Sequence, residues 1–298
     1  MTLVNLKDAL LHAELSGYAI GAFNLTGEDM LLGILDAAVD AKSPVILAIA
    51  EAHLPFMRWK SFMKMVIAEA ENASVPVVVH LDHASRFETI YKAFQLGFTS
   101  VMYDGSVLSF SENITNTQHI VKIAHSLDVS VEAELGHIVG TSDEVENTEI
   151  TLHQLTDPNL VPEFIEKTGI DALAVSFGTA HGFYVKEPEL NFDLLAEINK
   201  KTETPLVLHG GTGLPDDAFL QAIKLGIRKI NYGTDIFAVA TQAATRVLAA
   251  NPELIYYSSI SQEIRHAVTE RSTRYMHLWQ SAQKSWLRET QGVGGLHG

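Results

Sequence analysis

Short apolar runs rich in β-branched residues alternate along the chain with longer segments whose apolar positions repeat at i, i+3, i+4 and i+7. Each short run ends in polar or glycine-containing residues, which is typical of a strand that opens into a loop. The runs predict eight strands, at residues 19–24, 44–50, 76–82, 100–104, 130–134, 172–178, 205–209 and 229–232. The longer segments predict helices at residues 30–41, 62–71, 88–96, 113–127, 162–168, 192–200 and 216–225, and two more after the last strand, at 236–248 and 260–287.

Near-continuous apolar strands are what a parallel sheet covered on both faces requires. Eight strand–helix units with no break in composition are the number that closes a (β/α)₈ barrel. An open doubly wound sheet is the alternative, but no glycine-rich dinucleotide turn follows the first strand. We therefore predict an α/β fold, a single TIM-barrel domain over residues 1–290 with extra C-terminal helices, followed by a flexible glycine-rich tail at 291–298.

The chain has 298 residues, with 21 Lys and Arg against 36 Asp and Glu, so its formal net charge is -15. This charge would repel a phosphate backbone, and nucleic acid is therefore not an expected partner. Cysteine is absent from the sequence, so a metal ion would have to be held by histidines and carboxylates. No basic and apolar leader opens the chain, and no run reaches the roughly 20 apolar residues of a membrane span. We expect a cytoplasmic protein without a membrane partner.

In a barrel of this kind the functional residues lie at the C-terminal ends of the strands. His83, His181 and His209 follow three different predicted strands there. A single strand-end histidine is more often structural, but three that face one mouth suit a catalytic zinc with an open fourth position. Asp104 and Glu134 come from adjacent strands and could hold a second cation or an alternative position of the first. They could also be rim carboxylates with ordinary hydrogen bonds.

Asp82 stands directly before His83 at the end of the third strand. A carboxylate beside a metal can move a proton to or from a substrate hydroxyl, whereas the alternative roles are a helix N-cap or a partner for a histidine. His80 and Glu132 lie one step deeper on the same strand faces as Asp82 and Glu134, so we expect core or hydrogen-bonding roles for them.

Two glycine-containing runs follow the seventh and eighth strands, at residues 209–216 and 231–235. Each places bare backbone amides just ahead of a helix, which is the recurrent phosphate site of these barrels. Such amides can attract an anion locally even in a chain of strongly negative charge.

Six segments resemble, in order, the class II zinc-dependent ketose-bisphosphate aldolases, the family of fructose- and tagatose-bisphosphate aldolases. They are HLDH (80–83), DGS (104–106), VEAELG (131–136), GTAHG (178–182), LVLHGGTG (206–213) and KINYGTD (229–235). The resemblance runs from about Leu6 to Asp235. It implies a homodimer or homotetramer that acts on a small sugar phosphate.

The resemblance also implies a set of roles at the mouth of the barrel. His83, His181 and His209 would bind the catalytic Zn²⁺, and Asp104 with Glu134 would hold a second divalent cation. Asp82 would be the acid and base that acts on the C4 hydroxyl of the substrate, and a monovalent cation, Na⁺ or K⁺, would lie near the phosphate glycines. The implied substrate-binding residues are Asn24, Gly182, Gly210, Gly211, Thr212, Asn231, Tyr232, Gly233 and Thr234.

The reaction implied by the family is the reversible cleavage of a fructose- or tagatose-type ketose 1,6-bisphosphate, a step of carbohydrate metabolism such as glycolysis. The products are dihydroxyacetone phosphate and an aldehyde, glyceraldehyde 3-phosphate or a related acceptor. A metal that chelates the C2 carbonyl and the C3 hydroxyl spreads the charge of the carbanion into an enediolate. A zinc hydrolase on the same barrel is a competing hypothesis, although hydrolysis would not require paired phosphate loops.

Three segments depart from the family pattern. Near the start of the chain, the frequent Phe-Asn-x-x-Asn becomes Phe23-Asn24-Leu25-Thr26-Gly27. Ser142 stands where a loop glutamate usually shuttles the C3 proton, which leaves Asp143 or Glu144 as substitutes. Ala50 replaces a serine or threonine that helps to hold the distal phosphate. These changes predict that the dihydroxyacetone phosphate half of the substrate is retained and that the acceptor aldehyde is altered, including to one without a terminal phosphate. A member that binds its ligand without turnover is the further alternative.

Overall fold

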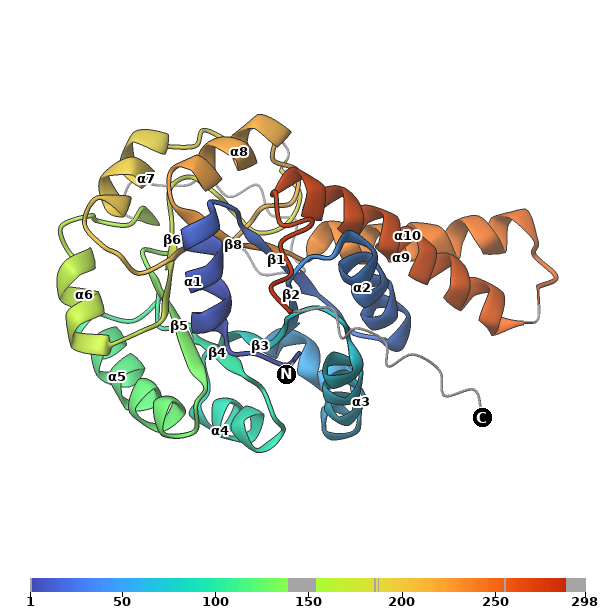
Figure 1. Ribbon diagram of the computed structural model, residues 1–298, viewed down its shortest axis with the longest axis horizontal. Coiled ribbons are helices and arrows are strands. Elements are labelled where there is room, and N and C mark those ends of the chain that lie inside the picture. The colour runs from blue at the N-terminus through green and yellow to red at the C-terminus, as the bar shows by residue number, and fades with distance from the viewer. Residues whose placement is uncertain (1, 139–153, 185, 187, 255, 288–298) are drawn as a thin grey trace, which may run out of the picture.

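The computed structural model describes residues 2–138, 154–184, 186, 188–254 and 256–287. In this part of the chain, eight parallel strands pair in chain order and β8 returns to β1, which closes a barrel (Figure 1). The predicted (β/α)₈ barrel is confirmed, and the open doubly wound sheet is wrong. The strands are β1 (Ile20–Asn24), β2 (Val45–Ala50), β3 (Val77–Ala84), β4 (Ser100–Tyr103), β5 (Ser130–Leu135), β6 (Ala172–Val175), β7 (Leu206–Leu208) and β8 (Ile227–Tyr232).

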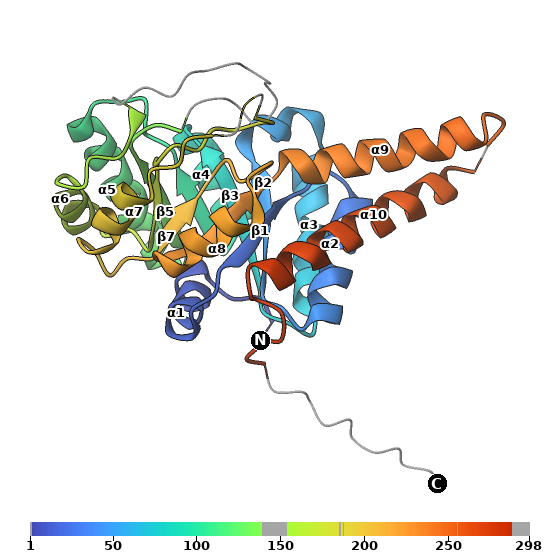
Figure 2. The same ribbon diagram turned by 90° about the horizontal axis from the view of Figure 1, so that it is seen from above.

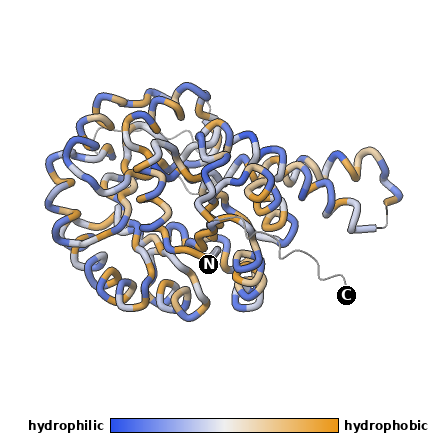
Figure 3. The backbone as a smooth tube through the Cα atoms, viewed as in Figure 1, coloured by the Kyte–Doolittle hydropathy of each residue, from blue (hydrophilic) through white to orange (hydrophobic). Residues whose placement is uncertain are grey.

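Helices alternate with the strands and surround the barrel, and their surfaces alternate between hydrophobic and hydrophilic positions (Figures 2 and 3). Among the described residues, no helix is both long and apolar enough to cross a membrane. The predicted tail at 291–298 lies outside the described residues. The helices are α1 (Leu6–Ser16), α2 (Glu28–Ala41), α3 (Trp59–Asn72), α4 (Phe87–Gln95), α5 (Phe110–Ser126), α6 (Val161–Thr168), α7 (Phe192–Asn199), α8 (Asp216–Lys224), α9 (Thr234–Ala250), α10 (Tyr257–Leu278) and the short 3₁₀ helix η1 (Glu51–Phe56).

Helix α1 was not predicted, although its ends carry recognisable signals. The Asn5 side chain accepts a hydrogen bond from the backbone amide of Asp8, and Gly17 ends the helix in the left-handed region at φ 69. The apolar face of α1 joins the cluster that fills the barrel interior, where Leu10 belongs with Ile20. The end of the barrel formed by the starts of the strands is therefore closed by an apolar plug.

The C-terminal extension forms a protruding hairpin of α9 and α10, with α10 also packed on α2 (Figures 1 and 2). The predicted single helix at 260–287 is wrong at its C-terminal end. Trp279 is buried and stacks on Phe23 with ring centroids 5.7 Å apart, and Gln280 then adopts a φ of 64, which an α-helix does not tolerate. The chain turns there and crosses the end of α2, where the Gln283 amide donates to the Ala41 carbonyl at 2.8 Å.

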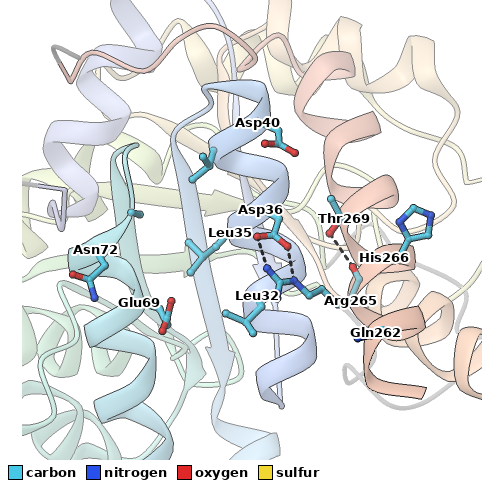
Figure 4. Close-up of a pocket in the computed structure, with 12 residues that line it drawn as sticks. Leu32, Leu35, Asp36, Asp40, Glu69, Asn72, Gln262, Arg265, His266 and Thr269 are labelled. Carbon is cyan, nitrogen blue, oxygen red and sulfur yellow. Dashed lines mark hydrogen bonds and ion pairs between the residues drawn. The ribbon is translucent and has the colours of Figure 1, made fainter. Parts of the chain in front are cut away.

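A groove of about 500 Å³ lies on the outside of the barrel between α2, α3 and α10 (Figure 4). Arg265 Nη2 donates to Asp36 Oδ1 at 2.7 Å there, and Thr269 Oγ1 donates to the Arg265 carbonyl at 2.8 Å. None of the predicted site residues lines this groove, so it is a feature of helix packing rather than of the strand ends.

Candidate metal centre and active site

A bulge in β3 brings two functional residues to the same mouth. Pairing with β4 shifts between Leu81 and Ala84, so that β3 carries one residue more than its partner. His83 takes a φ of 45, in the left-handed region that non-glycine residues rarely occupy. In a regular strand the side chains of Asp82 and His83 would point to opposite faces. The bulge removes this alternation and lets both side chains reach the barrel mouth.

Three histidine rings converge there from the ends of β3, β6 and β7. Candidate ligand nitrogens of His83, His181 and His209 all lie within 4.8 Å of one another. His83 Nε2 and His209 Nδ1 lie 2.8 Å apart. Zinc-bound nitrogens at about 2.0–2.1 Å from the ion would lie roughly 3.3 Å apart, so a small outward shift would admit the ion. The three residues that the sequence singled out are thus brought together in a geometry that fits zinc.

A second group shares His83 with two carboxylates. Ligand atoms of His83, Asp104 and Glu134 also lie within 4.8 Å of one another. His83 Nδ1 donates to Asp104 Oδ2 at 2.9 Å, and the Ile138 amide donates to Glu134 Oε1 at 2.9 Å. Glu134 Oε2 is buried and has no hydrogen-bond partner among the described residues. This oxygen fits a cation ligand, as expected for a second position or an alternative position of the first ion.

The electrostatics of the mouth favour a positive charge. Burial alone would lower the pKa of His83, but the neighbouring Asp82 and Asp104 raise it to about 10. Burial, followed by the charge of Asp104, raises the pKa of Glu134 to about 8. Without a metal, His83 therefore carries a proton at neutral pH, and a cation bound there would take the place of that proton.

Asp82 is held by two amides inside the barrel. Asn24 Nδ2 donates to its Oδ2 and Asn231 Nδ2 donates to its Oδ1, each at 2.9 Å, and the residue is 3% exposed. Burial would raise the pKa of Asp82, but the neighbouring His83 and His209 charges hold it well below its ordinary range. These hydrogen bonds come from side chains and not from a helix N-terminus, so they do not support the N-cap alternative.

The loops after β6, β7 and β8 approach one another closely at the candidate phosphate site. Gly210 has a φ of 70, and a Cβ there would lie 2.4 Å from the Ala180 carbonyl oxygen. A Cβ on Gly233 would lie 2.7 Å from Asn24 Oδ1. The N-cap residues of α8 and α9, Pro215 and Gly233, make no side-chain capping hydrogen bond. Only glycine permits this close approach, which brings main chain together near the starts of α8 and α9.

The other predicted phosphate-site residues lie in the same loops or at the end of β8, and Tyr232 differs from them in the orientation of its side chain. Thr212 Oγ1 accepts a hydrogen bond from the Asp235 amide at 3.3 Å, and Thr234 begins α9. Tyr232 is 1% exposed and packs in the layer outside the strands, where its hydroxyl donates to Asp235 Oδ2 at 3.0 Å. Its side chain therefore faces away from the mouth, which leaves its main chain for a ligand.

Tyr184 was not identified from the sequence, yet it ties two functional loops together. Its hydroxyl accepts from the Ala180 amide at 2.9 Å and donates to the Gly210 carbonyl at 2.7 Å. Burial raises the pKa of Tyr184 to about 12, so the phenol keeps its proton at neutral pH. In the sequence, Tyr184 is distinguished only by its position near His181. A tyrosine near a histidine is too common a pattern to predict a role.

The rim of the mouth at the end of β2 carries a buried acid, Glu51. Ala50 ends β2, and Glu51 begins η1. Glu51 Oε2 accepts from the Ser85 amide at 2.9 Å and from the Ser85 hydroxyl at 3.0 Å, while Oε1 accepts from Arg86 Nε at 3.0 Å. Hydrogen-bond donors at this rim are thus engaged by a carboxylate. The candidate loop acids at 142–144 lie outside the described residues.

The fold is a TIM barrel, and its mouth gathers a candidate metal centre beside a buried carboxylate. The family model "Fructose-bisphosphate aldolase class-II" matches residues 4–284. The chain belongs to this family, as its motifs predicted.

Curated relatives and a solved structure agree with this assignment. A probable fructose-bisphosphate aldolase of Bacillus subtilis is 43% identical over 256 residues, 85% of this chain and 89% of that protein. A fructose-bisphosphate aldolase of Staphylococcus aureus is 41% identical over 86% of this chain and 89% of its own length. The crystal structure of the YdjI aldolase from Escherichia coli K12 superposes with a TM-score of 0.82 at 35% identity and covers 95% of this chain and 99% of that one.

Proposed function

We propose that this protein is a zinc-dependent class II aldolase that reversibly cleaves a ketose 1,6-bisphosphate of the fructose or tagatose type. The products are dihydroxyacetone phosphate and an aldehyde, glyceraldehyde 3-phosphate or a related acceptor. The observation that carries the proposal is the convergence of three histidine nitrogens beside the buried carboxylate of Asp82. Membership of an aldolase family supports a lyase over a zinc hydrolase on the same barrel.

His83, His181 and His209 would hold the zinc ion, with Asp104 and Glu134 as ligands of a second divalent cation. Bound there, zinc supplies Lewis-acid charge to the carbanion that cleavage of the C3–C4 bond leaves. The chemistry of the donor set fits this ion, because neutral imidazoles are its preferred nitrogen ligands.

Asp82 would take the proton of the C4 hydroxyl during cleavage and return it during condensation. The amides of Asn24 and Asn231 hold both carboxylate oxygens in place. The neighbouring His83 and His209 keep the group ionised, so that it is ready to accept the proton. Their side chains therefore position the base as well as lining the site.

The phosphate of the dihydroxyacetone half would bind to main-chain amides of the loops after β6, β7 and β8. The close packing at Gly210 supports this placement, since it brings the backbones of the loops after β6 and β7 together. Gly233 directly precedes α9, so it places main chain at a helix start. A monovalent cation, Na⁺ or K⁺, would lie beside the same loops. The proposed residues are Gly182, Gly210, Gly211, Thr212, Asn231, Tyr232 through its main chain, Gly233 and Thr234.

A second form of this function has an altered acceptor, either from a ketose 1-phosphate or as an unphosphorylated aldehyde. The rim at Glu51 favours it, because this carboxylate engages the donors of Ser85 and Arg86 that an incoming phosphate would need. A negative charge at this place would also repel a phosphate.

The test is cleavage of fructose 1,6-bisphosphate, tagatose 1,6-bisphosphate and fructose 1-phosphate, with and without a chelator. The measured quantity is the release of dihydroxyacetone phosphate. We expect chelator-sensitive release. Comparable turnover of the 1-phosphate would support the altered acceptor, and a strong demand for the second phosphate would contradict it. Release that a chelator does not reduce would contradict the zinc aldolase. The homodimer or homotetramer and the cytoplasmic location stay predictions.

A further inference from the structure

A buried lysine–glutamate ion pair lies directly beneath the histidine set, and neither residue has a role in the chemistry above. Lys229 Nζ donates to Glu132 Oε2 at 2.7 Å and to its Oε1 at 3.0 Å. Glu132 Oε1 also accepts from His209 Nε2 at 2.8 Å. All three side chains are 0% exposed. Burying a charged lysine inside a barrel costs desolvation free energy, so we asked what these residues do in return.

The three residues reach the barrel axis from strands that are not all neighbours. Glu132 projects inward from β5, Lys229 from β8, and His209 follows β7. Apolar interior residues such as Met102 and Val207 pack within the same barrel. His209 is the member of this cluster of three that connects it to the candidate metal centre.

The hydrogen bonds on the two nitrogens of His209 differ in direction. Its Nε2 donates to Glu132, whereas its Nδ1 faces the mouth 2.8 Å from His83 Nε2. A neutral imidazole binds a metal only through the nitrogen that carries no proton, and the partner of the other nitrogen decides which one that is. A carboxylate beneath Nε2 thus selects Nδ1 as the ligand.

We propose that Glu132 is a positioning residue that holds His209 with Nε2 protonated and Nδ1 turned to the metal, and that Lys229 compensates its buried charge. This inference rests on the proposed zinc site. Lys229 contacts both oxygens of Glu132, so it keeps the carboxylate in place without contacting the ligand histidine itself.

A neighbouring histidine provides a matched control within the same layer. His80 Nδ1 is bonded to Ser100 Oγ at 2.9 Å, and its Nε2 stands 3.8 Å from Glu132 Oε2, beyond hydrogen-bond length. The Ser100→Ala variant removes a buried polar contact of this layer while leaving the bond between Glu132 and His209 intact.

The test compares two uncharged double variants that differ only at position 132. Glu132→Met with Lys229→Met replaces the ion pair by apolar side chains, which keeps the core filled and free of an unpaired charge. Glu132→Gln with Lys229→Met is also neutral but retains a carbonyl that can accept from His209 Nε2. Zinc affinity is measured by competition with a chromophoric chelator, and the visible spectrum of the Co²⁺ form reports ligand geometry.

We expect the first double variant to bind zinc about 10- to 100-fold more weakly than wild type and to show an altered Co²⁺ spectrum. The glutamine variant should recover most of this loss, and Ser100→Ala should stay within about threefold of wild type. If both double variants bind zinc as wild type does and keep its Co²⁺ spectrum, the inference is overturned.

A measurement on the wild-type protein removes dependence on variant folding. With ¹⁵N-labelled histidine and bound zinc, NMR should show His209 with a proton on Nε2 and the metal on Nδ1. The opposite tautomer overturns the inference and leaves the zinc site standing. Wild-type protein that takes up no zinc overturns the proposed metal centre and this inference with it.

Discussion

The mouth of the barrel and the layer directly beneath it use the same residue types for opposite purposes. At the mouth, the His83 and Asp104 side chains are 22% and 23% exposed, and carboxylates raise the pKa of His83 to about 10. Beneath them, His80 is fully buried, and burial followed by the Lys229 cation lowers its pKa to about 3. Two histidines three positions apart on one strand thus differ in charge at neutral pH, because His83 is protonated and His80 is neutral.

The role of a histidine in this barrel is therefore decided by its burial and by the charged side chains around it, and not by the residue type alone. His83 leaves the regular strand at a bulge and meets two acids, which makes it a site for a cation. His80 keeps the strand geometry and bonds to a serine hydroxyl, which makes it a neutral part of the core.

The largest expected effect that separates the two layers is at the mouth. Asp82→Asn keeps the size of the side chain but removes the proposed proton acceptor, so kcat should fall by about 10²- to 10⁴-fold. Steady-state cleavage is the measurement, and zinc content is the control, because Asp82 is not among the proposed ligands. A kcat within about tenfold of wild type, at full zinc content, would show that another group moves the proton.

The next effect concerns the stability of the buried layer in the metal-free protein. His80 has a pKa near 6.5 when unfolded and about 3 when folded, so the unfolded state binds more protons between these values. The stability from this residue is present above pH 6.5 and is lost as the pH falls toward 3. Between pH 7 and pH 5 the loss is about 2 kcal/mol.

His80→Gln tests this difference, since glutamine does not titrate and can still bond to Ser100. The fall in unfolding free energy from pH 7 to pH 5 should be about 2 kcal/mol smaller in the variant than in wild type. Urea unfolding of the chelated proteins at the two pH values measures it. Equal falls in the two proteins would mean that His80 is not held neutral.

The smallest effect is expected at the loops that carry the ligands. Tyr184→Phe removes the hydroxyl between Ala180 and Gly210 and should lower the unfolding free energy by about 1–2 kcal/mol. Tyr257→Phe is the control, because its phenol bonds to Asp29 at the surface and should matter by less than about 0.5 kcal/mol. Thermal melting compares them, and equal melting temperatures would contradict the role of Tyr184.

Much of the fold follows from the hydrophobic pattern alone, because each strand buries both faces and each helix buries one. Helix α1 was not predicted, because it begins after only five residues of the chain. Its capping residues, Asn5 and Gly17, are nevertheless ordinary helix-end signals. The end of α10 was not predicted, because the helix ends where Trp279 packs on Phe23, a residue far away in the sequence. Such long-range packing has no counterpart in a local pattern.

The histidines and acids of the site were predictable because they follow predicted strands, and motif resemblance supplied their roles. Period-two alternation could have shown that Tyr232 faces away from Asn231. It could not have shown the bulge that places Asp82 and His83 together, since one extra residue depends on pairing with β4. The burial of Lys229 was not predicted, because a strand lysine usually lies on the surface. Its burial depends on the ion pair with Glu132, which comes from a distant segment of the chain.

The most direct test of the central claim is a zinc titration of the chelated protein, with release of dihydroxyacetone phosphate from fructose 1,6-bisphosphate as the readout. The account predicts no cleavage without metal, followed by a rise that levels off at about one zinc ion per chain. Full cleavage by the chelated protein, before any zinc is added, would contradict it.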